Sequence, residues 1–355
     1  MGDIAFAYRL LSQLPRKGNL FFSPHSIRRA LAMVYEGSVG PTRDEMTRVC
    51  DFPDLGIMRQ MVMSRKGSCL HEANNVWVAA GLPVGIPFQA ILDAIYNAPL
   101  RKADFGQVEA TRAEINQWVE EQTRKRIQNL IGPKDIGPLT LMVLVNAIYF
   151  KDRWYTRFNP VNTRNDLPFL APEGEIKPPF MSLQARPGYA EGDTWEYLDL
   201  PFASGLSFGV LLPKSPDGLP DIEAALMAGT FRFNPCERKT VHVFLPRFRV
   251  EYGFSVKEAL EALGMRTAFS AEADFRGIAD GRLKLDDVIH KAFCEVEEQG
   301  VEAAAATGVQ GFQGYQGNMT DDYKVFYARS PFLFMIWEKV GGNVLFMGRM
   351  ENPEK

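Results

Sequence analysis

The sequence predicts an α+β fold, with a helical first part followed by a part built mainly from strands. Up to about Lys134, apolar residues recur at the 3.6-residue period of amphipathic helices. Beyond it, β-branched and aromatic runs bounded by proline and glycine dominate, which is the pattern of strands. No segment rich in proline, serine or charge divides the chain, so we expect one domain over residues 1–355.

The expected helices follow from this periodicity. They cover residues 4–14, 26–37, 42–50, 87–96 and 110–131, with Gly37 and Gly132 as stops. One strand-like run, ANNVWVAAG at 73–81, lies among them. The later strands are expected at 139–150, 195–202, 207–213, 239–252, 324–338 and 343–350, with a helix at 255–264. Several of these strands lack alternation, which predicts cover on both faces.

Composition excludes several classes of partner. With 46% apolar residues the 355-residue chain can bury a large core, and a net charge of −3 gives no basic field for nucleic acid. No run approaches the roughly 20 apolar residues that span a bilayer. Asp3 and Arg9 interrupt any export signal in the first helix, so we expect a cytoplasmic protein or the mature fragment of a secreted one.

Metal and cofactor sites are not indicated. The cysteines Cys50, Cys69, Cys236 and Cys294 lack CxxC spacing, and we expect free, mostly buried thiols. No two of the four histidines have the i, i+4 spacing of helical metal ligands, and no phosphate-binding glycine motif occurs. We therefore expect no metal and no cofactor.

Ser207 lies in GLSFG, which matches the G-x-S-x-G pattern of hydrolase nucleophiles. That motif needs a helix directly after the serine. Here a strand and a proline turn follow, so we interpret Ser207 as a strand residue and expect no catalytic site.

The passage GVEAAAATGVQGFQGYQGN, residues 300–318, fits neither pattern. Four alanines would suit a helix, but the Gly/Gln repeat beside them builds neither helix nor core.

Seven segments in series resemble the serpins, in order and at the family's spacing. They are NLFFSPHSIRRALAMVYEG (19–37), INQWVEEQTRKRI (115–127), LVNAIYFKDRW (144–154), LPRFRVE (245–251), LGMRTAFS (263–270), DDVIHKAFCEVEEQGVEAAAATG (286–308) and SPFLFMIWEKVGGNVLFMGRMENP (330–353). The short stretch between Cys50 and residue 73, together with a trimmed first helix, further resembles intracellular poxvirus serpins. A bacterial origin fits as well.

The resemblance implies a helical bundle packed on three β-sheets, with an exposed reactive-centre loop at residues 298–323. In serpins the cut loop inserts as a new strand in the central sheet while the protease is still acyl-linked to it. It thus implies a suicide inhibitor of a serine or cysteine endopeptidase, acting as a monomer and not itself an enzyme. The alternative is a non-inhibitory binding or structural protein of the same fold.

The resemblance also assigns residues. The loop's hinge is Glu298, Gly300, Val301, Glu302, Ala303, Ala304, Ala305, Ala306 and Thr307. Short side chains ease the passage of a segment between packed strands, and glycine supplies conformational freedom. A cluster at the sheet's opening point comprises Ser23, Ser26, Asn146, Trp154, Arg247 and His290, in which Arg247 should meet Glu298.

The scissile bond has four candidate positions. Counting sixteen residues from Glu298 gives Gly314, whereas counting from the carboxyl side points near Met319 and Thr320. Phe312 and Tyr315 suit a chymotrypsin-like protease, and the loop has no Lys or Arg for a trypsin-like one. Because the stretch before residue 73 is too short for the family's usual pair of helices, we expect no heparin activation.

Overall fold

Strands buried along their whole length lie at the centre of the fold. Every position of β4 (Met142–Phe150) and of β11 (Ser207–Pro213) is buried. Both faces of each strand are therefore covered, as the missing alternation predicted. The computed structural model describes residues 2–64, 69–231, 236–301 and 323–355.

The chain folds into two compact units. Unit 1 contains residues 1–14, 22–149 and 252–292, and unit 2 contains residues 15–21, 150–251 and 293–355. Three strands, β4, β14 (Phe248–Ser255) and β15 (Asp287–Glu297), begin in one unit and end in the other. A single domain over 1–355 stays a prediction.

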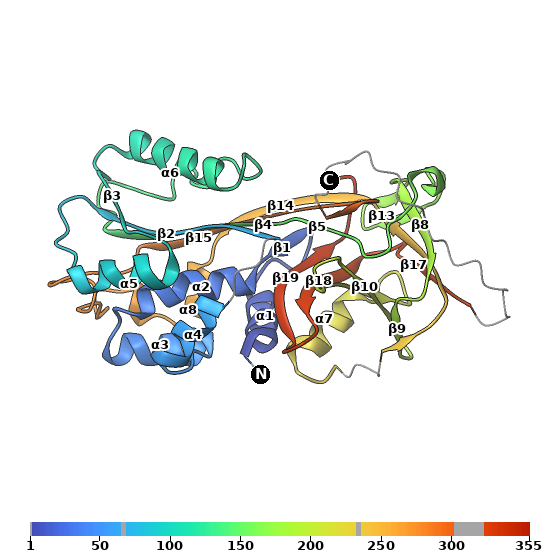
Figure 1. The fold of residues 1–355 in the computed structure, drawn as a ribbon, viewed down its shortest axis with the longest axis horizontal. Coiled ribbons are helices and arrows are strands. Elements are labelled where there is room, and N and C mark those ends of the chain that lie inside the picture. The colour runs from blue at the N-terminus through green and yellow to red at the C-terminus, as the bar shows by residue number, and fades with distance from the viewer. Residues whose placement is uncertain (1, 65–68, 232–235, 302–322) are drawn as a thin grey trace. The chain divides into compact units, whose positions relative to one another are not determined.

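Unit 1 holds most of the helices. They are α1 (Gly2–Gln13), α2 (Pro24–Tyr35), α3 (Gly40–Cys50), α4 (Leu55–Ser64), α5 (Ile86–Tyr96), α6 (Val108–Gln122), α8 (Lys257–Ala262) and the 3-10 turn η2 (Thr267–Phe269). Within this unit, Figure 1 shows α6 on one face of β2 (Leu70–Ala79) and β4, with α2 and α5 on the other.

The helix predicted over residues 110–131 is shorter than expected, and Gly132 does not end it. α6 stops at Gln122 because Arg124 and Lys125 adopt left-handed φ angles of 52° and 63°. The Thr123 hydroxyl donates to the Val119 carbonyl at 2.7 Å, which closes the last turn. No local sequence signal marks this end, since neither residue is glycine or asparagine.

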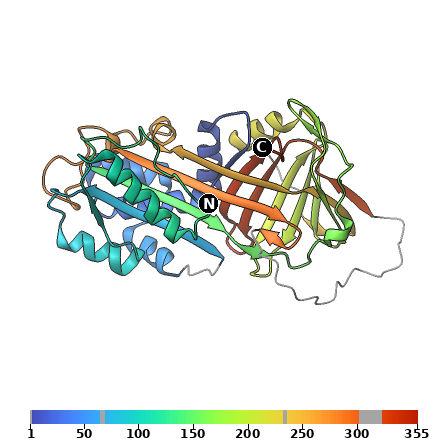
Figure 2. The same ribbon diagram turned by 90° about the horizontal axis from the view of Figure 1, so that it is seen from above.

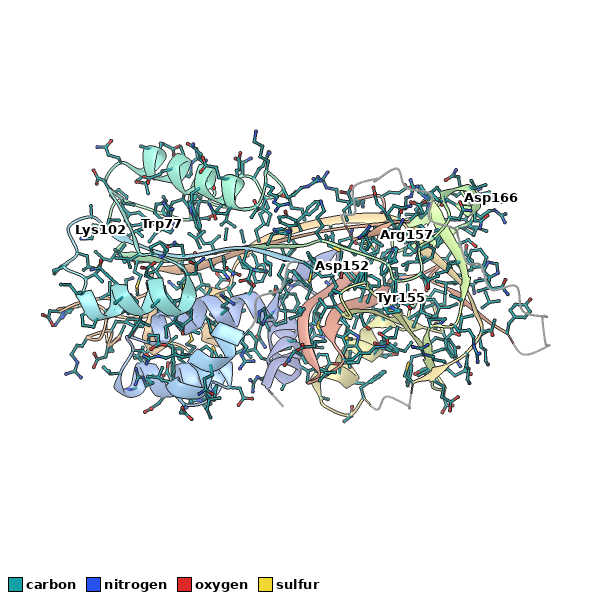
Figure 3. All side chains as sticks on the ribbon, in the orientation of Figure 1. Trp77, Lys102, Asp152, Tyr155, Arg157 and Asp166 are labelled. Atoms are coloured by element: carbon teal, nitrogen blue, oxygen red, sulfur yellow. The ribbon has the colours of Figure 1, made fainter. Side chains whose placement is uncertain are left out.

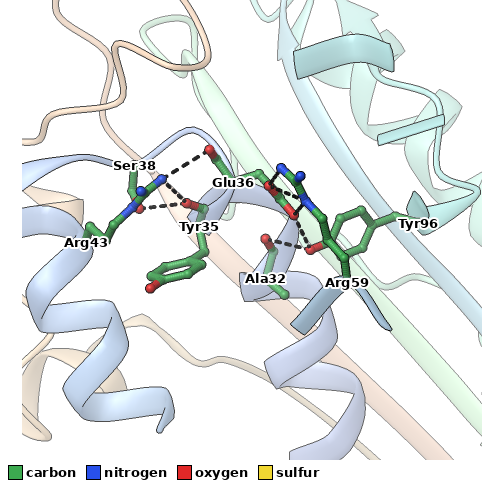
Figure 4. Close-up of polar contacts among 7 residues, drawn as sticks. All are labelled: Ala32, Tyr35, Glu36, Ser38, Arg43, Arg59 and Tyr96. Carbon is green, nitrogen blue, oxygen red and sulfur yellow. Dashed lines mark hydrogen bonds and ion pairs between the residues drawn. The ribbon is translucent and has the colours of Figure 1, made fainter. Parts of the chain in front are cut away.

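Glu36, just after α2, connects three helices of unit 1 (Figure 4). The Nε atom of Arg59 in α4 donates to its carboxylate at 3.0 and 3.2 Å, and the Tyr96 hydroxyl of α5 donates at 3.1 Å. Glu36 is 8% exposed, so the pair is held in a poorly solvated site. In the described part of residues 51–69, α4 is the helix present, in line with the short stretch that the sequence shows.

The first sheet, sheet I, contains the central strands. Its strand order is β3 (Arg101–Ala103), β2, β4, β15, β16 (Gly300–Val301) and β5 (Asp152–Arg153), and β14 pairs with β15. Figure 2 shows β4 and β15 side by side, as this order requires.

Two further sheets complete the strand framework. Sheet II has the order β1 (Leu20–Phe22), β19 (Asn343–Met350), β18 (Phe332–Glu338), β11, β10 (Trp195–Pro201), β9 (Gly188–Glu191) and β12 (Glu237–Arg238). Sheet III has the order β17 (Lys324–Tyr327), β13 (Val241–Pro246) and β8 (Phe180–Ala185). The remaining elements are the pair β6 (Phe169–Ala171) and β7 (Gly174–Ile176), α7 (Leu219–Met227) and η1 (Pro160–Asn162).

Arg349 of β19 connects both ends of the chain within unit 2. Its guanidinium donates to the Gly18 carbonyl at 3.0 Å, to the Pro15 carbonyl, and to the Glu223 carboxylate of α7 at 3.0 Å. The side chain is 2% exposed, so its charge needs these partners. The stacked rings of Phe21 and Phe346, 5.2 Å apart, extend the same junction.

The thiols are partly as expected. Cys50 and Cys294 are buried and Cys69 is half-buried, whereas Cys236 is exposed.

Candidate functional site

The predicted loop begins inside sheet I. β16 pairs antiparallel with β15 on one side, with Val301 opposite Val296, and with β5 on the other, with Val301 opposite Asp152. The Val301 side chain is fully buried. The first residues of the loop segment are thus strand residues with neighbours on both edges, a pairing that the sequence analysis did not predict.

Gly300 is required at its position. Its φ is +151°, and a Cβ added there would lie 2.1 Å from the Asp152 carbonyl oxygen and 2.6 Å from the Arg153 Cα. Backbone atoms cannot yield as a flexible side chain can, so only glycine allows β5 to approach this closely. Figure 3 labels Asp152 of β5, which is the register partner of the next residue, Val301.

Glu298 is bound by two side chains of unit 2. The Arg247 Nε donates to both carboxylate oxygens at 2.8 Å, and the Thr163 hydroxyl donates at 2.5 Å. Burial by itself raises the pKa of Glu298, but the hydrogen bonds from Arg247 and Thr163 outweigh it and lower the pKa below its ordinary value. The structure thus brings Arg247 and Glu298 together; Thr163 carried no sequence signal.

Trp154 fixes the backbone at the same point. Its indole Nε1 donates to the Glu297 carbonyl at 2.7 Å, and its main-chain N–H donates to the Gln299 carbonyl at 3.1 Å. The Phe158 N–H donates a hydrogen bond of 3.1 Å to the carbonyl between them, that of Glu298. Trp154 is 2% exposed and stacks on Phe202 with the ring centres 4.7 Å apart. Three consecutive carbonyls before Gly300 are therefore held.

A second group, the polar cluster of Ser23, Ser26, Asn74, Asn146 and His290, lies within unit 1. Asn146 donates through Nδ2 to the Ser26 Oγ at 2.6 Å and contacts His290 Nδ1 through its Oδ1. The Ser23 main-chain N–H donates to His290 Nε2 at 3.1 Å. These four predicted residues therefore meet in space, although up to 267 positions separate them.

The cluster cannot serve as a catalytic Ser-His pair. Since Nε2 accepts from Ser23, the ring proton resides on Nδ1 and faces the Asn146 oxygen, which leaves no lone pair for a general base. Burial lowers the pKa of His290 to about 3. The imidazole is neutral and fully engaged at physiological pH.

Asn74 is the member that sequence reasoning missed. Its Oδ1 accepts from the Ser26 hydroxyl at 3.3 Å and from Asn146 Nδ2. The sequence signal that could have found Asn74 is its polar side chain inside the strand-like run at 73–81.

Comparison with known proteins decides the family. A family model described as serpin (serine protease inhibitor) matches residues 2–353.

The chain belongs to the serpin family.

One relative and two solved structures show which proteins this serpin is similar to. It is 37% identical to an uncharacterized serpin-like protein of Thermococcus kodakarensis, over 99% of this chain and 84% of that one. A structure of a highly specific serpin of the insect Tenebrio molitor is 32% identical, with a TM-score of 0.89, covering 98% of this chain and 96% of that one. A structure of thyroxine-binding globulin in complex with thyroxine is 26% identical, with a TM-score of 0.85, covering 99% of this chain and 98% of that one. The fold of this chain is accordingly the α+β serpin fold; the poxvirus resemblance stays a prediction.

The G-x-S-x-G motif and the residue types that could bind a metal can be located in the structure. Ser207 begins β11 and is buried between strands β10 and β18, as its interpretation as a strand residue predicted. Within residues 2–64, 69–231, 236–301 and 323–355, no His, Cys, Asp and Glu side chains gather so that they could hold a metal ion. Across the same residues, every helix is too short or too polar to cross a membrane.

Several predicted residues lie outside the described ones. These are the hinge residues Glu302, Ala303, Ala304, Ala305, Ala306 and Thr307 and the scissile-bond candidates Phe312, Gly314, Tyr315 and Met319. Their roles stay predictions.

Proposed function

We propose that this serpin is a suicide inhibitor of a serine endopeptidase and traps its target by inserting the cut loop into sheet I. The observation that carries the proposal is β16. Gly300 and Val301 already occupy a strand position between β15 and β5, with Val301 fully buried. Each further residue that follows them into the sheet extends an existing strand and needs no new nucleation.

The chemistry is that of an interrupted hydrolysis. The target's serine hydroxyl attacks the carbonyl of the scissile bond, the C–N bond breaks, and the new amine leaves with the proton, so that the loop is esterified to the enzyme. About ten new ladder pairs at about 1 kcal/mol each, plus buried side chains, supply a driving force on the order of ten kcal/mol. Insertion that outruns water's attack on the ester leaves the protease covalently attached.

The composition of the loop supports insertion. Ala303 to Ala306 offer little steric hindrance to a strand that passes packed neighbours. Strand alternation assigns residues 303, 305 and 307 to the same side as the buried Val301. All three are small or compact, as a buried face demands.

The expected target is chymotrypsin-like, since Phe312, Tyr315 and Met319 suit an apolar primary pocket and residues 300–323 contain no Lys or Arg. A papain-like cysteine protease is the second candidate target. The specificity of such enzymes depends on the residue before the cut, and Phe312 followed by Gln313 would suit it. We expect a monomeric inhibitor that heparin does not accelerate.

The decisive experiment incubates the protein with chymotrypsin, trypsin and a papain-like protease, and searches for an SDS-resistant complex whose cut site is mapped by mass spectrometry. We expect a complex with chymotrypsin and a cut within Phe312 to Gln316. A loop that every protease cuts without forming a complex would exclude inhibition. A non-inhibitory binding protein, of which thyroxine-binding globulin is an example among the similar structures, would then be the preferred function.

A further inference from the structure

An exposed thiol of unit 2 lies beside a buried carboxylate. Of the four cysteines, all of which belong to the described residues, only Cys236 is exposed, and it directly precedes β12. A Cβ added at Gly188 of β9 would lie 2.7 Å from the Cys236 Sγ. The sulfur therefore rests on the main chain of this glycine, and a larger residue at position 188 would displace it.

The carboxylate is that of Asp199 on β10. Asp199 is the register partner of Gly188, and its Oδ2 would lie 3.3 Å from the same added Cβ. The Cys236 Sγ and the Asp199 Oδ2 are thus at most 6.0 Å apart, which is the sum of the two distances. Both groups lie over Gly188, on one face of sheet II.

The Asp199 carboxylate can accept a further hydrogen bond. The side chain is 3% exposed, and its Oδ2 forms an ion pair with Lys339, which follows β18. Its Oδ1 is buried and accepts no hydrogen bond from any described residue. A buried carboxylate oxygen without a donor costs free energy, so a donor that reaches this carboxylate is bound favourably.

Asp199 outweighs Lys339 in its effect on the sulfur. Burial, followed by the Asp199 charge, raises the pKa of the Cys236 thiol, while the weaker effect of the Lys339 ammonium lowers it. A positive group attached close to Sγ is therefore attracted by the site, whereas a negative one is repelled.

We propose that Cys236 is a modification site that forms mixed disulfides with small thiols carrying an ammonium group two carbons from their sulfur. The Cys236 thiolate attacks one sulfur of an external disulfide, the external S–S bond breaks, and the departing thiolate takes up the proton that Cys236 released. A free thiol reverses the reaction by the same route. The modified fraction then follows the ratio of disulfide to thiol around the protein, and it does not depend on the trapping of a protease.

The length of such an adduct fits the site. The new S–S bond measures about 2.05 Å, and an ammonium two carbons beyond it lies roughly 5–6 Å from Sγ in an extended chain. The Asp199 Oδ2 is no more than 6.0 Å from Sγ, so the ammonium reaches the carboxylate and donates to it. Charge-assisted hydrogen bonds of this kind are about twice as strong as neutral ones, so a neutral hydroxyl at the same place gains less.

The test measures the equilibrium of the full chain with two redox buffers whose thiols have equal length. One contains cysteamine and cystamine, and the other contains 2-mercaptoethanol and its disulfide, in which a hydroxyl replaces the ammonium. Intact mass and peptide mapping give the modified fraction of Cys236. The reference is the same chain unfolded in urea, where Asp199 no longer lies beside the thiol. We expect the cysteamine adduct of the folded protein to be favoured at least about fivefold over the hydroxyl adduct, relative to that reference.

Two variants assign this preference to the carboxylate. Asp199→Asn keeps the shape of the side chain and removes its charge, and it should reduce the preference to that of the unfolded chain. Lys339→Gln removes the competing cation and should raise the preference at least about twofold. If Asp199→Asn does not fold, Lys339→Gln decides by itself. Lys355→Gln is the matched control, because Lys355 pairs with Glu173 instead, and it should leave the preference unchanged.

Equal stability of the two adducts in the folded wild type overturns the proposal, and so does a folded Cys236 that forms neither adduct while the unfolded chain forms both. A preference that survives in folded Asp199→Asn, or that is the same in Lys339→Gln as in wild type, also overturns it. Loss of the preference in Asp199→Asn together with its increase in Lys339→Gln supports the site.

Discussion

At His290 burial decides the protonation state, and stability should depend on pH as a result. The folded state keeps the pKa near 3, whereas the unfolded chain has the ordinary value of 6.5. Between these values the unfolded state binds a proton that the folded state does not. The free energy of unfolding should therefore fall as the pH drops below 6.5, by up to about 1.4 kcal/mol per pH unit.

Urea unfolding at pH 7, 6 and 5 measures this slope. His290→Gln should be less stable at pH 7 because the contacts with Ser23 and Asn146 change, yet its stability should decline less steeply with acid. Parallel curves for the two proteins would show that His290 is not the titrating group.

Glu298 predicts a second, more acidic effect. Because its folded pKa lies below the ordinary value, its ion pair with Arg247 stabilises the fold above about pH 4.5 and is lost as the pH falls through the folded pKa. Glu298→Gln should cost about 1–3 kcal/mol at pH 7, since the hydrogen bonds lose their charged acceptor. Unfolding curves of variant and wild type should converge below pH 4.5; a constant difference would contradict the assignment.

At the residue scale the sequence led to part of the site. Family resemblance, and no spacing rule, predicted which residues come together. These are the pair Arg247 and Glu298 and the group Ser23, Ser26, Asn146 and His290. Thr163, Phe158 and Asn74 were missed because a polar or aromatic residue in a strand or turn carries no sign of a partner far along the chain. Contacts of this kind are set by the tertiary fold alone.

Among the elements, β16 leads to a direct test. Gly300→Ala places a Cβ against the Asp152 carbonyl, so residues 300–301 should leave their place between β15 and β5. Hydrogen exchange at residues 300–301 and 152–153 should accelerate at least tenfold, while Gly137→Ala, where an added Cβ meets nothing within 4 Å, should show no change. Unchanged protection in Gly300→Ala would mean that β5 yields instead.

Substitutions in the hinge should prevent the inhibitor from trapping the protease. Thr307→Arg would force a charge onto the buried side of the inserted strand, and Ala303→Pro would remove a ladder N–H. Both should turn the inhibitor into a substrate that is cut and released. Glu302→Arg changes the opposite side, which already carries a charge, and should trap far better than the other two.

Gel analysis of protease mixtures gives the ratio of complex to cut protein for each hinge variant. Wild-type ratios in both Thr307→Arg and Ala303→Pro would count against insertion.

Element boundaries show where sequence reasoning stops. The strands β4 and β11 were predicted because apolar runs without alternation are typical of strands covered on both faces. The end of α6 was placed nine residues too late because two left-handed residues, Arg124 and Lys125, stop it without a glycine. β16 was not predicted, since two residues between glutamine and glutamate contain no periodicity and their pairing with β5 spans about 150 positions.

For the whole molecule, cutting the loop should raise the melting temperature. If the loop inserts, a gain on the order of ten kcal/mol in a chain of 355 residues corresponds to at least about 10 °C. Calorimetry before and after limited chymotrypsin digestion measures it. An unchanged melting temperature after complete cleavage would favour the non-inhibitory alternative.

The junction at Arg349 has a consequence for synthesis on the ribosome. β1 pairs with β19, and 320 residues lie between Phe22 and Asn343. At translation rates of about 5–20 residues per second, Phe21 and the carbonyls of Pro15 and Gly18 wait roughly 16 to 64 seconds for their partners Phe346 and Arg349. During that time β11 lacks its neighbour β18 and exposes an apolar sheet edge. Unit 2 therefore completes its fold only after release of the nascent chain, and chaperones that shield such edges would assist it.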